Sequence, residues 1–246
     1  FYQFGENFKI PTKFFLNNAA NLLAPRETPQ ATKKVNSAYA SASFAYQDFL
    51  YVDLTSRNDW SSTLGEENRS YMYNSASVSA IVHSFIDPEQ TLFNLLKIRA
   101  GYAQVGNDTD PYQLSQTFDV PGQGYFGLTT LSAPSIKLNP DLKPEQVTSV
   151  EFGIEGSMLG NRLNFDISVY DKETTDMIFN VPVAAATGYQ FFKENVGKVS
   201  NKGVEITIGG RLIQNSKMVW DTSFNYAKNE NELLSLIDDL ETFTYM

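Results

Sequence analysis

The sequence contains no cysteine and a single histidine, His83. Without cysteine there is no disulfide framework and no thiolate chemistry. One histidine leaves only carboxylates to complete a zinc site, which disfavours zinc. A Ser-His-acid triad would have to use His83, which falls within a predicted strand with no partner motif. We therefore predict no catalytic residue, no metal and no other cofactor.

Long apolar runs and basic charge are also scarce. No run approaches the ~20 residues of a membrane-spanning helix, so a membrane location would require a barrel, which satisfies its backbone hydrogen bonds without helices. The net charge of −9 argues against nucleic acid as a partner. The opening residues Phe1–Phe4 show no basic start, apolar core or cleavage site. An exported protein without such a signal is expected to be mature or truncated.

The dominant pattern that is present has a period of two. Apolar and polar residues alternate strictly over Leu163–Tyr170, Val150–Glu155 and Val204–Ile208, which predicts strands with one apolar and one polar face. Strands are predicted over 33–46, 49–59, 71–84, 94–105, 145–157, 161–173, 195–212 and 217–229, with a further strand near the N-terminus. Several match or pass the ~9–11 residues of a tilted membrane strand.

Short and long connections between these strands alternate along the chain. The short ones are 47–48, 158–160 and 213–216, the long ones are 60–69, 106–144 and 174–194, and the intermediate 85–93 fits least well. Outer-membrane barrels sort short periplasmic turns from long extracellular loops in this way. Aromatic residues also lie near predicted strand ends, as in the aromatic girdles of such barrels: Phe44, Tyr46, Phe49, Trp60, Tyr71 and Tyr73.

Charged residues keep to one side of the predicted strands. A lysine or arginine facing lipid costs about 2–4 kcal/mol at mid-bilayer, so these side chains must face water. That water is a lumen if the sheet closes into a barrel, or bulk solvent in a sandwich, and the period of two does not distinguish these cases. The residues concerned are Asp53, Arg57, Lys97, Arg99, Glu151 and Glu155.

The two longest connections supply candidates for binding a ligand or a partner. Exposed aromatic rings beside polar groups stack on sugars or pack on proteins, or they bury the loop against its neighbours. Asn107–Asp110 places side-chain oxygens at alternate positions, as calcium loops do, but the glycine and closing glutamate of an EF-hand are missing, so a polar turn before Pro111 is favoured. The candidates are Asp108, Asp110, Tyr112, Tyr125, Phe126, Phe191 and Phe192.

Five segments carry a family resemblance. They are Tyr51–Leu64, Arg69–Ser75, Lys97–Asn107, Leu142–Glu145 and Asn195–Glu205. In this order they resemble strand and turn motifs of the SusC/RagA family of TonB-dependent transporters. Their roles in that pattern are architectural, because they mark strand starts, turns and register rather than chemistry.

The resemblance implies an all-β fold, an antiparallel transmembrane segment of a 22-stranded barrel with a plug inside. It also implies a place in the outer membrane in contact with lipid, a SusD-like surface lipoprotein as cap, and energy from TonB with ExbB and ExbD through the plug. The substrates would be oligosaccharides or peptides, and the six water-facing residues would line the lumen and hold the plug. We expect residues 1–246 to be a partial barrel domain without plug and remaining strands, ending in another outer loop near 238–246.

Two other functions compete with transport. A soluble all-β carbohydrate-binding module with aromatic loops would also alternate with a period of two. An outer-membrane enzyme would require His83.

Overall fold

The computed structural model describes residues 5–10, 19–22, 31–87, 89, 92–120 and 130–236. Tyr125, Phe126 and the outer loop expected near 238–246 lie outside the described residues. The chain divides into two compact units, residues 1–32 and 33–246. The prediction of one partial barrel domain over 1–246 stays a prediction. In the first unit, β1 (Gly5–Phe8) pairs antiparallel with β2 (Ala19–Leu22).

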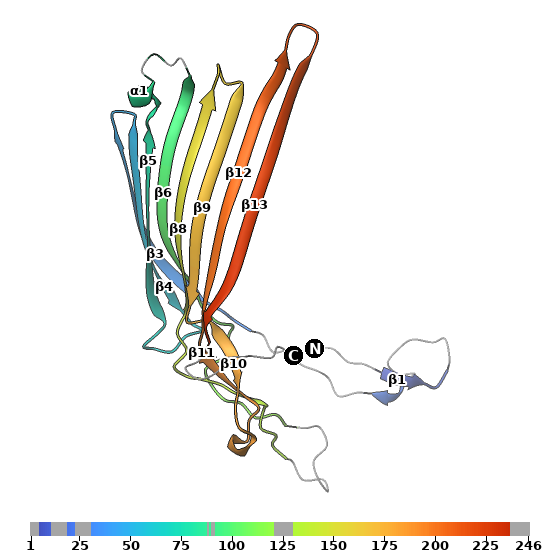
Figure 1. Ribbon diagram of the computed structural model, residues 1–246. Coiled ribbons are helices and arrows are strands. Elements are labelled where there is room, and N and C mark those ends of the chain that lie inside the picture. The colour runs from blue at the N-terminus through green and yellow to red at the C-terminus, as the bar shows by residue number, and fades with distance from the viewer. Residues whose placement is uncertain are drawn as a thin grey trace. The chain divides into compact units, whose positions relative to one another are not determined.

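The second unit is built on one eight-stranded antiparallel sheet with the order β13-β12-β9-β8-β6-β5-β4-β3 (Figure 1). Its strands are β3 (Val35–Tyr46), β4 (Leu50–Ser61), β5 (Ser70–Ile81), β6 (Phe93–Asn107), β8 (Glu145–Met158), β9 (Leu163–Thr175), β12 (Lys198–Gln214) and β13 (Val219–Ser235). All eight predicted strands are therefore confirmed. Neighbours in the sheet follow each other in sequence apart from inserted loop elements, as in a meander.

Two strand ends were predicted wrongly. Strand β13 continues past 229 to Ser235, because β12 pairs with it as far as Lys198. Strand β5 stops at Ile81, and His83 begins the one-turn helix α1 (His83–Ile86) instead of continuing the strand. The pairing of β5 with β6 starts at Ile81 opposite Lys97, and the Val82 N–H donates to the Leu96 carbonyl at 2.7 Å. The chain must reverse direction there, and the helical turn makes the reversal. Among the described residues, no helix is long and apolar enough to cross a membrane.

Connections of different length lie at opposite ends of this sheet (Figure 1). The turns β3–β4, β8–β9 and β12–β13 and the α1 connection lie at one end, called here the turn end, and the three long connections lie at the other, called the loop end. At the turn end, Gln47 and Asp48 adopt positive φ angles of 48° and 53°. Two successive left-handed residues match the right-handed twist of a hairpin.

The two longest connections meet in a second, smaller sheet at the loop end. Strand β7 (Ile136–Lys137) comes from the first, and β10 (Ile178–Pro182), the 3₁₀ turn η3 (Ala185–Thr187) and β11 (Phe191–Asn195) come from the second. Strand β11 lies in the middle, antiparallel to β10 and parallel to β7. The sequence pattern did not predict these short strands.

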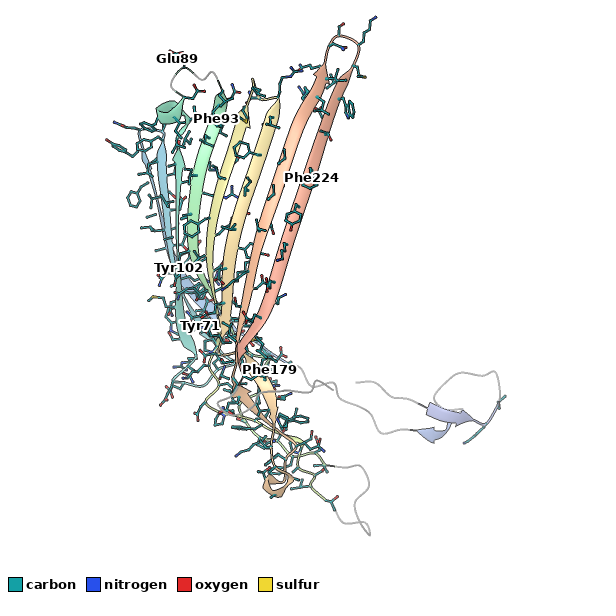
Figure 2. All side chains as sticks on the ribbon, in the orientation of Figure 1. Tyr71, Glu89, Phe93, Tyr102, Phe179 and Phe224 are labelled. Carbon is teal, nitrogen blue, oxygen red and sulfur yellow. The ribbon has the colours of Figure 1, made fainter. Side chains whose placement is uncertain are left out.

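The main sheet has an apolar face and a polar face, and side chains project from both (Figure 2). Register on the apolar face aligns rows of apolar residues across all eight strands, such as Tyr46, Leu50, Ala80, Ile98, Ile154, Ile167, Ile206 and Tyr226. Many of its large side chains are exposed, including Phe44, Leu54, Ile98, Tyr102, Phe152, Val169 and Phe224. A surface of this kind needs an apolar environment.

Candidate functional site at the loop end and on the polar face

The register places all six predicted water-facing residues on the polar face. Asp53 stands opposite Ser77, Ser77 opposite Gly101, and Gly101 opposite Glu151. Arg57, Lys97, Arg99 and Glu155 follow on the same face by the alternation of side chains along each strand. The structure thus brings together residues from β4, β6 and β8.

Arg99 links three strands on this face. Its guanidinium contacts the Asp166 carboxylate on β9 at 2.8 Å and the Glu151 carboxylate on β8 at 3.6 Å. Gly153 lies beneath it, since a Cβ there would come within 2.5 Å of the guanidinium carbon. Lys97 and Glu155 pair at 3.3 Å on the same strands. These charges therefore satisfy one another within the sheet.

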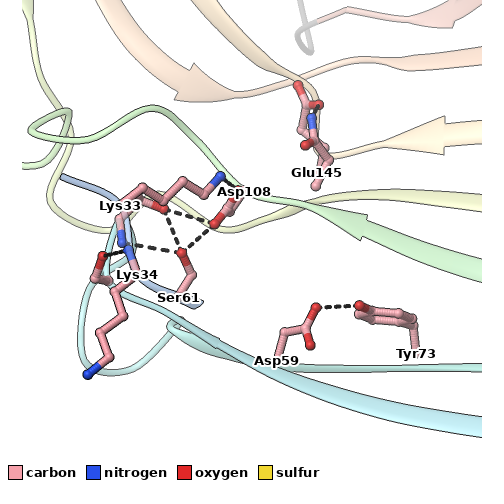
Figure 3. A network of polar contacts seen from close by, with 10 residues as sticks. Lys33, Lys34, Asp59, Ser61, Tyr73, Asp108 and Glu145 are labelled. Carbon is pink, nitrogen blue, oxygen red and sulfur yellow. Dashed lines mark hydrogen bonds and ion pairs between the residues drawn. The ribbon is translucent and has the colours of Figure 1, made fainter. Parts of the chain in front are cut away.

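A second polar group lies toward the loop end. Arg57 donates to Asp59 at 2.8 Å and to the Ser37 hydroxyl at 2.9 Å, and the Tyr73 hydroxyl donates to Asp59 (Figure 3). Asp53 accepts from the Ser43 hydroxyl at 2.6 Å. Like the Arg99 group, these contacts tie neighbouring strands together through side chains.

Asp108, directly after β6, ties the loop end to the start of the second unit. Its carboxylate accepts from Lys33, from the Ser61 hydroxyl, and from the Thr63 hydroxyl at 3.1 Å (Figure 3). The side chain is only 6% exposed. Burial acts to raise the pKa of Asp108, but the hydrogen bonds and the Lys33 charge outweigh it and hold that pKa below its ordinary value. This arrangement stabilises the ionised carboxylate.

Glu145 joins the two long connections at their bases. It accepts from the Asn107 side chain at 2.9 Å and from the Ile178 N–H at 2.9 Å. Asn195 exchanges two hydrogen bonds of 2.8 Å with the Lys143 backbone. The segments that carried the family resemblance thus meet at one place, where Leu64 and Leu142 are buried. Their architectural role follows from these contacts.

The other loop candidates lie apart from this junction. Asp110 and Tyr112 are exposed in the connection after β6, and Tyr112 is 65% exposed. Phe191 and Phe192 belong to β11, where the Lys137 ammonium lies 5.3 Å from the Phe192 ring centroid. None of these contacts decides between ligand, partner and packing roles.

A metal site and His83 are the two features that chemistry other than transport would use. No three histidine or acidic side chains gather as metal ligands in the part of the chain that the structure describes. His83 is at the turn end, and its Nδ1 is buried without a hydrogen-bond partner.

Several residues of these groups were missed from the sequence. Asp166 was assigned to the polar side, but its pairing with Arg99, 67 residues away, had no local signal. Lys33 lies 75 residues from Asp108. Glu145 could have been found from the sequence, because it ends Leu142–Glu145, one of the five segments that resemble the family.

The chain has clear relatives. A family model described as "TonB dependent receptor-like, beta-barrel" matches residues 1–243. The TonB-dependent receptor P39 of Formosa agariphila is 34% identical over 227 residues, covering 89% of this chain and 21% of that protein. The TonB-dependent receptor SusC of Bacteroides thetaiotaomicron is 26% identical over 220 residues, covering 85% and 22%. The chain therefore spans about a fifth of the length of these relatives.

Solved structures agree in fold. The RagAB peptide transporter matches with a TM-score of 0.87 and 24% identity, over 98% of this chain and 27% of that one. The siderophore receptor PirA of Pseudomonas aeruginosa matches with a TM-score of 0.53 and 16% identity, over 82% and 35%. The open sheet is thus similar to part of a larger barrel wall, and the chain belongs to the TonB-dependent receptor β-barrel family, with SusC- and RagA-type proteins among its relatives.

Proposed function

We propose that this chain forms part of the wall and outer loops of an outer-membrane transporter that imports oligosaccharides or peptides. The observation that carries the proposal is the division of one sheet into an exposed apolar face and a polar face with internally paired charges. In a closed barrel the first face meets lipid and the second lines the lumen. The gathering of the long connections at one end supports an outer surface there.

The family suggests the other components of the proposed transporter. The polar face would line the lumen and contact a plug, through which TonB with ExbB and ExbD supplies energy. A SusD-like lipoprotein would meet the loop end, where Asp110, Tyr112, Phe191 and Phe192 lie. The name of the RagAB transporter says that it carries peptides, and the relationship to SusC leaves oligosaccharides as the other class for this chain.

The alternatives are less well supported. In a soluble binding module, Ile98, Phe152 and Phe224 would face water, because these side chains are 48%, 58% and 61% exposed. Large apolar side chains exposed in this way disfavour such a module. An enzyme would need His83, which is at the end of the sheet opposite the long loops (Figure 1).

The test starts from the whole protein in its native envelope. We expect a heat-modifiable band in the outer-membrane fraction, copurification of a surface lipoprotein, and loss of uptake of labelled oligosaccharides or peptides when the gene is deleted. Supplying the two substrate classes separately identifies the class. A soluble product without detergent that binds glycan directly would replace the transporter with a binding module.

The lumen role of the polar face has its own experiment. All six charges are neutralised with isosteric or apolar residues: Asp53→Asn, Arg57→Gln, Lys97→Met, Arg99→Gln, Glu151→Gln and Glu155→Gln. We expect looser seating of the plug, seen as faster proteolysis, and reduced uptake with little change in substrate affinity. The matched control neutralises Lys202 and Glu230 on the opposite face. Unchanged uptake in the sixfold variant would exclude the lumen role.

A further inference from the structure

Strands β5 and β6 separate before they reach the loop end. Their ladder runs from Ile81–Lys97 to Ser75–Ala103. Beyond that point β5 pairs only with β4, as far as Ser70, and β6 pairs only with β8, as far as Asn107. In lipid such unpaired backbone would be expensive. Here the outward residues are Asn74 and Gln104, so the opening lies beyond the apolar rows, where water reaches it.

An aromatic ring occupies the opening. A Cβ at Gly106 would come within 2.7 Å of the Tyr71 ring, so the ring lies directly against the β6 backbone. Tyr71 also stacks on Tyr73, with ring centroids 6.1 Å apart and 26° between the planes. Past this opening, Asp108 reaches Ser61 and Thr63 at the β4 end, on the far side of β5 in the order of the sheet. These contacts hold the chain in place directly after β6.

A cavity of about 230 Å³ lies beside the tyrosine rings, where the two strands separate. Its walls include both tyrosines, Gly106 and Met72, with polar side chains from three connections. Four of these side chains form no hydrogen bond or ion pair with any other described residue: Glu67, Lys143, Gln146 and Asp176. Gln146 is half-buried and the other three are exposed, so these polar groups border the cavity beside the aromatic rings, a combination that ligand sites use.

The lining selects a class of ligand. The volume lies below the ~300 Å³ at which drug-sized pockets begin, so it admits one ring-sized group. The lining carries one ammonium, Lys143, and three carboxylates, Glu67, Glu145 and Asp176, so its negative net charge disfavours an anionic ligand. Tyrosine rings offer flat apolar faces with a polar edge. The Gln146 amide can donate to and accept from hydroxyl groups, and the carboxylates accept from them. We propose that the cavity between β5 and β6 binds one neutral sugar unit.

The sugar has two possible sources that share this chemistry. One is the imported glycan, and the other is the head group of a glycolipid beside the wall, because Met72 and Gln146 belong to the outward set of side chains. The proposal rests on the proposed function for the membrane placement. It adds a site at the loop end of the wall, to which Tyr71 and Tyr73 contribute from the polar face and Met72 and Gln146 from the outward face.

The experiment uses the purified full-length transporter in detergent. In one combined variant, Gln146→Ala removes the amide, and Asp176→Asn removes a carboxylate charge while keeping a residue that tolerates the positive φ at this position. Met72→Trp fills the mouth of the cavity. Leu54→Trp on β4 and Lys228→Met on β13 are the controls, since neither lines the cavity. Binding of neutral gluco-, galacto- and manno-oligosaccharides is measured by calorimetry, and copurifying glycolipid by mass spectrometry.

Two results support the site. If wild type and both controls bind a soluble oligosaccharide and the two cavity variants bind it about ten-fold more weakly, the source is the imported glycan. If no soluble sugar binds but glycolipid copurifies and is lost only in the cavity variants, the source is the membrane. If wild type holds neither, or the cavity variants equal the controls, the proposal is wrong. Uptake by wild-type cells is measured separately, so its absence would count against the transporter function and not against the cavity.

Discussion

The two flanks of the main sheet differ where they approach the loop end. On β3, β4 and β5 the outward residues beyond the apolar rows are uncharged: Ala38, Ala40, Ser56, Asn58, Met72 and Asn74. On β9, β12 and β13 they are charged apart from Thr175 and Ser200: Asp171, Glu173, Lys198, Lys202, Lys228, Glu230 and Glu232. The first flank is fixed by the buried contacts of Asp108, and the second by exposed pairs such as Lys202–Asp171 at 3.4 Å. One sheet is therefore stabilised by burial on one side and by solvated charge on the other.

The first polar residue also comes at a different height on each flank. Lys228 lies in the same cross-strand row as Val169 and Val78. Asp171 and Lys202 lie in the next outward row toward the loop end. Ser56 and Asn74 lie in the row after that. The boundary between apolar and polar outward residues thus crosses the rows obliquely. Strands tilted within a barrel wall require this, because a flat membrane surface is not parallel to their hydrogen bonds.

The largest expected effect is a charge placed inside the apolar rows. Ile98→Lys on β6 should destabilise the protein by about 2–4 kcal/mol in a bilayer, because the ammonium would face lipid. Asn74→Lys on β5, beyond the boundary, should cost about 0–1 kcal/mol. Urea unfolding of the whole protein in lipid vesicles measures both. Equal costs would show that the oblique boundary is misplaced.

Removing the buried carboxylate of the first flank comes next. Asp108→Ala should cost about 1–3 kcal/mol, because Ser61, Thr63 and Lys33 lose their acceptor. This loss of stability is smaller than that of breaking a fully buried ion pair, since Lys33 is 41% exposed. Hydrogen exchange of the 61–64 segment should rise in the variant. Protection equal to wild type would mean that the contacts of Asp108 do not stabilise the 61–64 segment.

The same carboxylate gives the first flank a pH dependence. The folded pKa of Asp108 lies below its ordinary value, so its stabilisation is present above about pH 4 and is lost as the pH falls through the folded pKa. Asp108→Asn should flatten the acid limb of unfolding below about pH 4. The second flank, held by exposed pairs, should respond to salt more than this contact does.

The middle of the sheet offers a matched pair of glycines on the polar face. Gly153→Ala should cost about 1 kcal/mol, because the new Cβ displaces the Arg99 side chain from Glu151 and Asp166. Nothing lies within 4 Å of a Cβ at Gly101, so Gly101→Ala should be neutral or stabilise by about 0.4–1 kcal/mol. Thermal unfolding of both variants decides the sign.

The smallest effect is expected on the charged flank. Lys202→Met should change the free energy of unfolding by about 0–1 kcal/mol, because the Lys202 and Asp171 side chains are 63% and 53% exposed. Raising the salt concentration should erase the difference from wild type. A cost above that of Asp108→Ala would reverse the comparison between the flanks.

Much of the fold was predictable because it depends on alternation. Strict alternation predicted all eight strands, most of them to within a few residues of their ends, although β13 runs on to Ser235. It also predicted the shared face of Asp53 and Glu151, since antiparallel register preserves side. Strand β7 has only two residues and pairs with β11 across two connections, so no local pattern marks it. Asp108 looked like an ordinary polar turn residue because its partners Lys33, Ser61 and Thr63 are distant in sequence. The cavity was not predictable either, since it exists only where a ladder ends early.

The small sheet of β10, β11 and β7 makes the two long connections depend on each other for their structure. Strand β11 has a neighbour from its own connection on one side and a neighbour from the other connection on the opposite side, and Glu145 joins their bases. A graft of one connection onto another barrel would leave an edge of β11 open and Glu145 without one of its donors. Recombination between related transporters should therefore exchange residues 108–144 and 176–197 together, and chimaeras that separate them should assemble poorly.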